Sequence, residues 1–87
     1  MNLGIIGGGV MGLVIASKLS RQGYTVHVME SESQLGGLAT WFDYKEFVWD
    51  KFYHVILASD SHILGLIDEL NLSDRVRWAS TKTGFLW

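Results

Sequence analysis

Three glycines near the start of the chain could do binding chemistry. Gly7, Gly9 and Gly12 have the spacing G-x-G-x-x-G, between an apolar run and a helical pattern. In a dinucleotide-binding turn the first glycine permits a tight bend, the second lets backbone approach a pyrophosphate, and the third lets helix and strand pack closely. N–H groups at a helix start also attract phosphate. We therefore predict that this turn, with Val10 and Met11 at the helix start, binds a dinucleotide through its main chain.

An acidic residue lies where such a site needs one. Glu30 ends a second apolar run about 20 residues beyond the glycines, where a carboxylate accepts hydrogen bonds from a ribose diol. Ser31 follows it and is included in the predicted site. A carboxylate here repels a 2′-phosphate, which disfavours NADP. The alternative is that Glu30 is only a solvated turn residue.

A second glycine pair, Gly36 and Gly37, follows the acid by six residues and precedes Leu38. A plain NAD-binding fold does not require this pair. With the stretches "FVWDKFYHVI" and "LNLSDRVRWASTKTGF", it makes the sequence resemble the FAD-containing amine oxidase, protoporphyrinogen oxidase and phytoene desaturase superfamily. The resemblance covers essentially all of residues 1–87, but only the N-terminal part of such an enzyme.

The resemblance implies a cofactor and roles for the motif residues. FAD would be the cofactor of a flavin-dependent oxidoreductase, with no catalytic residue identifiable and the substrate domain absent. Gly7, Gly9 and Gly12 would hold the pyrophosphate and Glu30 the adenosine ribose. The pair Gly36 and Gly37, with Leu38, would line a second loop near the flavin dinucleotide.

The elements that must position these residues are those of an α/β fold. The pattern predicts a buried strand over residues 2–6, a helix over 10–22 stopped by Gly23, and a strand over 24–29. This is a Rossmann-like βαβ unit with a parallel sheet, and we expect an incomplete domain.

The second half of the chain has weaker patterns. Two short strands are expected within residues 40–50, around a turn at 44–46, followed by a helix over 61–71 and a strand over 75–80. The candidate N-caps of this helix are Ser59, Asp60 and Ser61. Asn71 at its end is suited to the left-handed conformation that stops a helix.

Composition limits the classes of partner. The net charge of −2 and pI near 5.8 disfavour nucleic acid, and the lack of cysteine excludes thiolate chemistry and fits the cytoplasm. The apolar run over residues 3–16 is too short to span a bilayer. The 13% of aromatic residues exceeds what one βαβ unit hides, so we expect the rest of an enzyme, or a second copy in a homo-oligomer, as partner.

Other polar and aromatic residues have simpler interpretations. Asp50 and His54 could border a flavin, but a capping or core role is favoured, and His27 should lie on the outer strand face. His54 and His62 lack a third metal ligand at a supporting spacing, so no metal site is predicted. Three carboxylates are expected to be solvated turn residues, namely Asp43, Glu46 and Asp50. Four aromatic residues are expected to be hydrophobic core, namely Trp41, Phe42, Phe47 and Trp49.

Two functions remain open from the sequence. The first is the FAD-binding portion of a flavin-dependent oxidoreductase. The second is a non-catalytic nucleotide-binding or interaction module that binds NAD or ADP, or no ligand.

Overall fold

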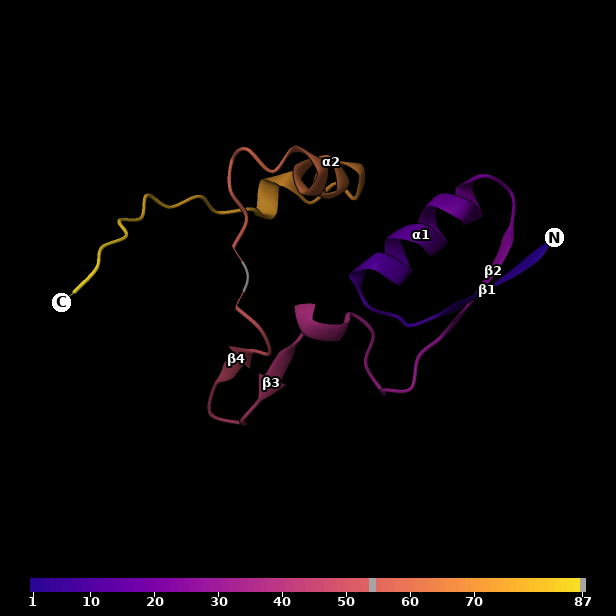
Figure 1. Cartoon of the computed structure of the whole chain (residues 1–87), viewed down its shortest axis with the longest axis horizontal. Coiled ribbons are helices and arrows are strands. Elements are labelled where there is room, and N and C mark those ends of the chain that lie inside the picture. The colour runs from indigo at the N-terminus through magenta and orange to yellow at the C-terminus, as the bar shows by residue number, and fades with distance from the viewer. Residues whose placement is uncertain (54, 87) are drawn as a thin grey trace. The chain divides into compact units, whose positions relative to one another are not determined.

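A computed structural model describes residues 1–53 and 55–86. The chain divides into two compact units, Met1–His54 and Val55–Trp87. The first unit contains a βαβ segment and a small hairpin, and the second contains one α-helix followed by a short 3₁₀ turn, as Figure 1 shows along the chain.

The βαβ segment consists of β1 (Asn2–Ile6), α1 (Val10–Arg21) and β2 (Thr25–Met29). The two strands pair in parallel, with Leu3 opposite Val26 and Ile5 opposite Val28. A parallel pair needs a crossover, and α1 provides it. The predicted α/β fold with a Rossmann-like βαβ unit is therefore confirmed; within the described residues its parallel sheet has two strands.

Helix α1 begins at the predicted residue, Val10, and ends at Arg21, one residue before the predicted end. Gly23 has a φ of 95°, a left-handed conformation that costs glycine little, and its N–H donates to the carbonyl of Ser20. Lys18 and Arg21 lie in the last turn, where positive charge is favoured by the helix dipole.

The expectation that residues 2–6 form a fully buried strand is wrong. Burial alternates along β1 and β2, so that Leu3, Ile5, Val26 and Val28 are partly covered and the opposite face is open. Ile6 on that open face is 89% exposed. His27 lies on the same outer face, as predicted. One helix covers one face of a sheet, so the other stays in contact with solvent.

The predicted hairpin is present in the same unit. After the 3₁₀ turn η1 (Gly37–Ala39), β3 (Trp41–Asp43) pairs antiparallel with β4 (Val48–Asp50). Lys45 at the turn has a φ of 73°, and its N–H donates to Asp43 Oδ1 at 2.8 Å. Asp43 is exposed, as expected, but it is the last residue of β3 and not a turn residue.

The second unit confirms one predicted element and corrects two other expectations. α2 (Ser61–Glu69) forms, and Asn71 after it is left-handed with a φ of 57°. Asp60 occupies the N-cap position, but its carboxylate accepts the N–H of Leu57 instead of capping the helix. The strand predicted over 75–80 is absent: the 3₁₀ turn η2 (Ser73–Arg75) overlaps its start, and Val76 is extended without a strand partner in the described part of the chain. An extended segment becomes a strand only with a partner.

Burial is concentrated at one place. Over residues 1–53 and 55–86 no hydrophobic side chain is buried, and the expected aromatic core is wrong, since Trp41, Phe42, Phe47 and Trp49 are 46–69% exposed. The buried positions in the described chain are Gly8 and Thr40.

Among described residues, no helix is long and apolar enough to cross a membrane.

Candidate dinucleotide-binding site

The first glycine loop connects β1 to α1 through a bend that depends on two glycines. Gly7 has a φ of 102°, and its N–H donates to the carbonyl of Met29 at 2.8 Å, which ties the loop to the end of β2. A Cβ at Gly12 would overlap the carbonyl oxygen of Gly7. The helix can approach the strand end this closely only because position 12 lacks a side chain.

Gly9 differs from Gly12 in a way that bears on ligand binding. A Cβ at Gly9 would meet no atom within 4 Å, and its φ of −74° is open to any residue. The first helical hydrogen bond runs from Leu13 N–H to Gly9 carbonyl, so the N–H groups of Val10 and Met11 precede the helical ladder. No acidic residue lies in this turn. The helix start therefore presents main-chain donors beside a space that the chain itself leaves empty.

Glu30 is held by the first glycine loop. Its Oε1 accepts the N–H of Gly8 at 2.9 Å, and its Oε2 accepts the N–H of Glu32 at 3.1 Å. The N–H groups of Glu32 and Gly8 lower the pKa of the Glu30 carboxyl, and hydrogen bonds from Ser31 lower it further. Glu30 is therefore not merely a solvated turn residue: it is an ionised anchor between β2 and the loop.

The second glycine loop lies against the first. Gly36 N–H donates to the carbonyl of Gly8 at 2.8 Å, and Gly36 forms an isolated parallel bridge with Gly9. Gly36 and Gly37 have φ values of 112° and 57°, and a Cβ at Gly37 would lie 3.2 Å from the Gly9 Cα. Leu38 after them is 65% exposed. The structure thus brings together all three predicted segments: the first loop, the acid and the second loop.

Two residues at this contact were missed by the sequence reasoning. A Cβ at Gly8 would lie 2.6 Å from Leu35 Cδ2, the end of a flexible side chain, and 3.2 Å from Glu30 Cβ, so the middle glycine of the "GGG" run lies in close contact with the segments around it. The Thr40 hydroxyl donates to the carbonyl of Gly37 at 2.7 Å. The available signals were the uninterrupted glycine triplet and a threonine three residues after a glycine, a spacing that favours such local bonds.

The other candidate residues form no comparable site. Asp50 is exposed at the end of β4, and its suggested pairing with His54 falls outside the described residues. In the described part of the chain, no cluster of three or more His, Asp or Glu side chains could hold a metal ion.

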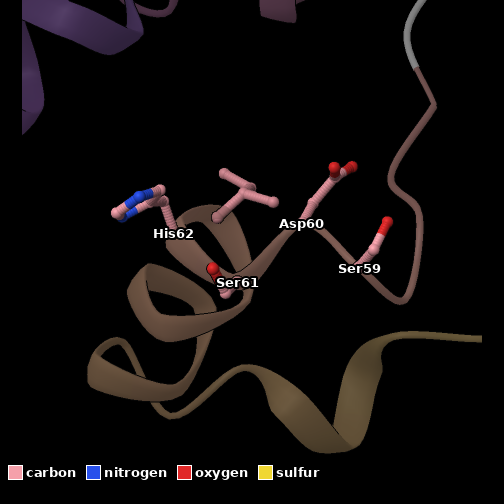
Figure 2. A pocket seen from close by; sticks show the side chains of 5 residues that line it. Ser59, Asp60, Ser61 and His62 are labelled. Carbon is pink, nitrogen blue, oxygen red and sulfur yellow. The ribbon is translucent and has the colours of Figure 1, made fainter.

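A hollow of about 360 Å³ lies in the second unit, at the start of α2. Residues Ser59–Ile63 line this hollow, and Figure 2 shows Asp60 and His62 among them. The Asp60 carboxylate beside it disfavours an anion at this helix start. The glycine loops remain the better-supported site.

Comparison with known proteins agrees with this geometry. Residues 5–70 match the family described as "NAD(P)-binding Rossmann-like domain". The chain is 35% identical over 81 residues to the 15-cis-phytoene desaturase of Synechococcus elongatus, covering 92% of this chain and 17% of that protein. It is 34% identical over 71 residues to the mitochondrial protoporphyrinogen oxidase of Nicotiana tabacum, covering 82% and 14%. The resemblance expected from the motifs is confirmed.

A third relative matches a shorter stretch. The flavin-containing monooxygenase FMO GS-OX2 of Arabidopsis thaliana is 56% identical over 34 residues, covering 39% of this chain and 7% of that protein. The chain thus spans about a sixth or less of the length of these curated relatives.

Proposed function

This chain belongs to the family of NAD(P)-binding Rossmann-like domains, and from that premise we propose that it binds FAD. It would serve as the N-terminal cofactor-binding part of a flavin-dependent oxidoreductase of the amine oxidase and protoporphyrinogen oxidase type. Its site would consist of the first glycine loop with Val10 and Met11, the acid with Ser31, and the second loop with Leu38.

The observation that carries this proposal is the open space at Gly9. Because an added Cβ there meets no atom of the chain, the lack of a side chain serves no internal packing purpose that the described contacts reveal. The main-chain N–H groups at the start of α1 lie next to this space. A pyrophosphate fits such a cradle, since it accepts hydrogen bonds from main-chain donors and is attracted by the positive end of the helix dipole.

Glu30 could hold a ribose in place of its contacts with Ser31. An ionised carboxylate has about four acceptor positions. The N–H groups of Gly8 and Glu32 use one position on each oxygen, and the backbone and side chain of the exposed Ser31 also donate to this carboxylate, so a ribose diol would replace the Ser31 contacts. The same negative charge would repel a 2′-phosphate, which supports FAD or NAD over NADP.

Two observations favour FAD over NAD. The Gly36–Gly37 loop lies against the first loop, and a plain NAD-binding fold does not require this second glycine pair. One relative is named a flavin-containing monooxygenase, and others are a desaturase and an oxidase. Bound FAD would supply hydride acceptance from a substrate; this chain's own residues would bind and orient its adenosine diphosphate half.

The decisive experiment compares wild type with Gly9→Val by FAD titration and thermal unfolding. We expect only a small decrease in the unfolding midpoint, because a Cβ at position 9 meets no atom although valine is a poorer N-cap than glycine. FAD binding should weaken at least about tenfold, because that open space is the proposed pyrophosphate position. Gly84→Val is the matched control, since a Cβ there also meets nothing and Gly84 lies in the other unit.

Parallel titrations with NAD and ADP separate the alternatives. Tighter binding of NAD than FAD would favour a nucleotide-binding module without flavin chemistry, whereas equal binding of ADP and FAD would mean that this chain holds only the adenosine diphosphate half. FAD affinity that is unaffected by Gly9→Val would contradict the proposed site.

Self-association is part of this proposal. The outer edges of β1 and β2 lack a strand partner within the described chain, and such edges pair readily with another strand. We expect light scattering to show a homo-oligomer at high concentration, and a monomer there would contradict it. A cytoplasmic location stays a prediction from composition.

A further inference from the structure

Thr40 is the buried polar residue of the described chain, with 6% of its surface exposed. It lies between the second glycine loop and β3, outside every motif in the sequence. A buried hydroxyl requires a hydrogen-bond partner, and the contacts of Thr40 show what its burial achieves.

Thr40 holds the second loop by three contacts. Its Oγ1 donates to the Gly37 carbonyl at 2.7 Å, and its own N–H donates to the same carbonyl at 3.3 Å. Its Cγ2 methyl occupies the space beside Gly36, only 2.6 Å from where a Cβ would be. Hydroxyl and methyl thus restrict two adjacent glycines, the residue type with the greatest backbone freedom to lose.

The opposite side of Thr40 is tied to the hairpin. The N–H of Lys51, directly after β4, donates to the Thr40 carbonyl at 3.1 Å. Thr40 is therefore the point at which the loop is connected to a paired element, while Gly36 N–H on the loop's other side is bonded to the Gly8 carbonyl at 2.8 Å.

From these contacts we propose that Thr40 is a positioning residue: it fixes Gly36 and Gly37 against the first glycine loop and thereby raises the affinity for the dinucleotide. The effect on affinity rests on the function proposed above. Ordering two glycines in the free chain means that their conformational entropy is not lost again when the ligand binds.

The test uses three variants of the whole chain and two measurements. Thr40→Val keeps the branched shape and removes the hydroxyl, whereas Thr40→Ser keeps the hydroxyl. Thr25→Val makes the same chemical change at an exposed position of β2 and is the control. FAD titration measures affinity, and amide hydrogen exchange at Gly36 measures the order of the loop without ligand.

We expect Thr40→Val to weaken FAD binding about fivefold, the effect of one lost hydrogen bond. The Gly36 amide should exchange faster, while the Leu13 amide in α1 is unchanged. Thr40→Ser should stay within about twofold of wild type in affinity, and Thr25→Val should change neither quantity.

The two proposals fail in different ways. Equal FAD affinity and equal Gly36 exchange in Thr40→Val and wild type would overturn the role of Thr40 and leave the proposed function standing. A wild-type chain that binds neither FAD nor NAD would overturn the proposed function and the affinity effect together. Gly36 exchange would still decide whether Thr40 orders the loop.

Discussion

The glycine-loop junction and the aromatic hairpin lie within one compact unit but differ in how much of each is buried. The junction consists of Gly7–Gly9, Glu30, Gly36–Gly37 and Thr40, and contains the buried positions of the described chain. The aromatic hairpin consists of β3 and β4 with Phe42, Tyr44, Phe47 and Trp49, all 46–69% exposed. The most closely packed part of this unit is therefore the one with the smallest side chains, where backbone groups make the contacts.

The two regions also differ in the kind of interaction they use. The junction is joined by hydrogen bonds between segments far apart in sequence, such as Gly8 with Glu30 and Gly36 with Gly8. The hairpin uses local contacts: Tyr44 and Phe47 have ring centroids 5.1 Å apart, and the Lys51 ammonium lies 5.6 Å from the centre of the Phe42 ring. Substitutions should therefore be costly in the junction and mild in the hairpin.

Gly12→Val, beside the junction, should have the largest effect. Its Cβ would overlap the Gly7 carbonyl, so the strand end and α1 must separate, at a cost of about 3 kcal/mol or more. Urea unfolding followed by circular dichroism measures this. Gly65→Ala in α2 is the control, because a Cβ there meets nothing and helix propensity gains about 1 kcal/mol. Equal losses of unfolding free energy in Gly12→Val and Gly65→Ala would contradict the expected cost of the contact at position 12.

Gly36→Ala should follow, with a loss of about 1–3 kcal/mol. The φ of 112° is strained for alanine, and the new Cβ would lie 2.6 Å from the Thr40 methyl. The double variant Gly36→Ala with Thr40→Ser removes that methyl, so part of the loss should be recovered. If the double variant is no more stable than Gly36→Ala in urea unfolding, the methyl contact is not what limits position 36.

Glu30→Gln should have a smaller and pH-dependent effect. Because the folded pKa of Glu30 lies below its ordinary value of 4.5, its ionised form stabilises the fold above that value, and the contribution is lost as the pH falls through the lowered pKa. Urea unfolding from pH 7 to pH 3 should show wild type more stable than Glu30→Gln at pH 7, with the difference shrinking below pH 4.5. A difference that grows on acidification would contradict the sign.

Trp49→Ala should have the smallest effect, within about 0.5 kcal/mol, because the side chain is 69% exposed. Unfolding followed by circular dichroism measures it independently of tryptophan fluorescence. A loss as large as that of Gly36→Ala would mean that the hairpin stabilises the unit as much as the junction does, and the contrast between them would fail.

The sequence predicts local features well and tertiary ones only in part. The βαβ elements, the left-handed Gly23 and Asn71, and the hairpin turn are each set by a few neighbouring residues. Their signals, namely apolar periodicity and residues that tolerate positive φ, are present in the sequence itself.

The failures share a physical cause, which is dependence on distant residues. Residues 76–80 have a strand composition but no partner in the described part of the chain, and the Asp60 carboxylate bonds Leu57 instead of the helix start. The roles of Gly8 and Thr40 exist only because the two glycine loops meet. Their burial follows from that meeting and could not be derived from the residues around either of them.

The main-chain donors at the start of α1 have a consequence for engineering. Val10 and Met11 are 46% and 75% exposed, yet what each would contribute to an anion is its backbone N–H. Randomising these two side chains therefore leaves the donors in place while changing the chemistry of the rim around them. A small combinatorial library at these two codons is thus a route to altered ligand preference that need not rebuild the anion cradle.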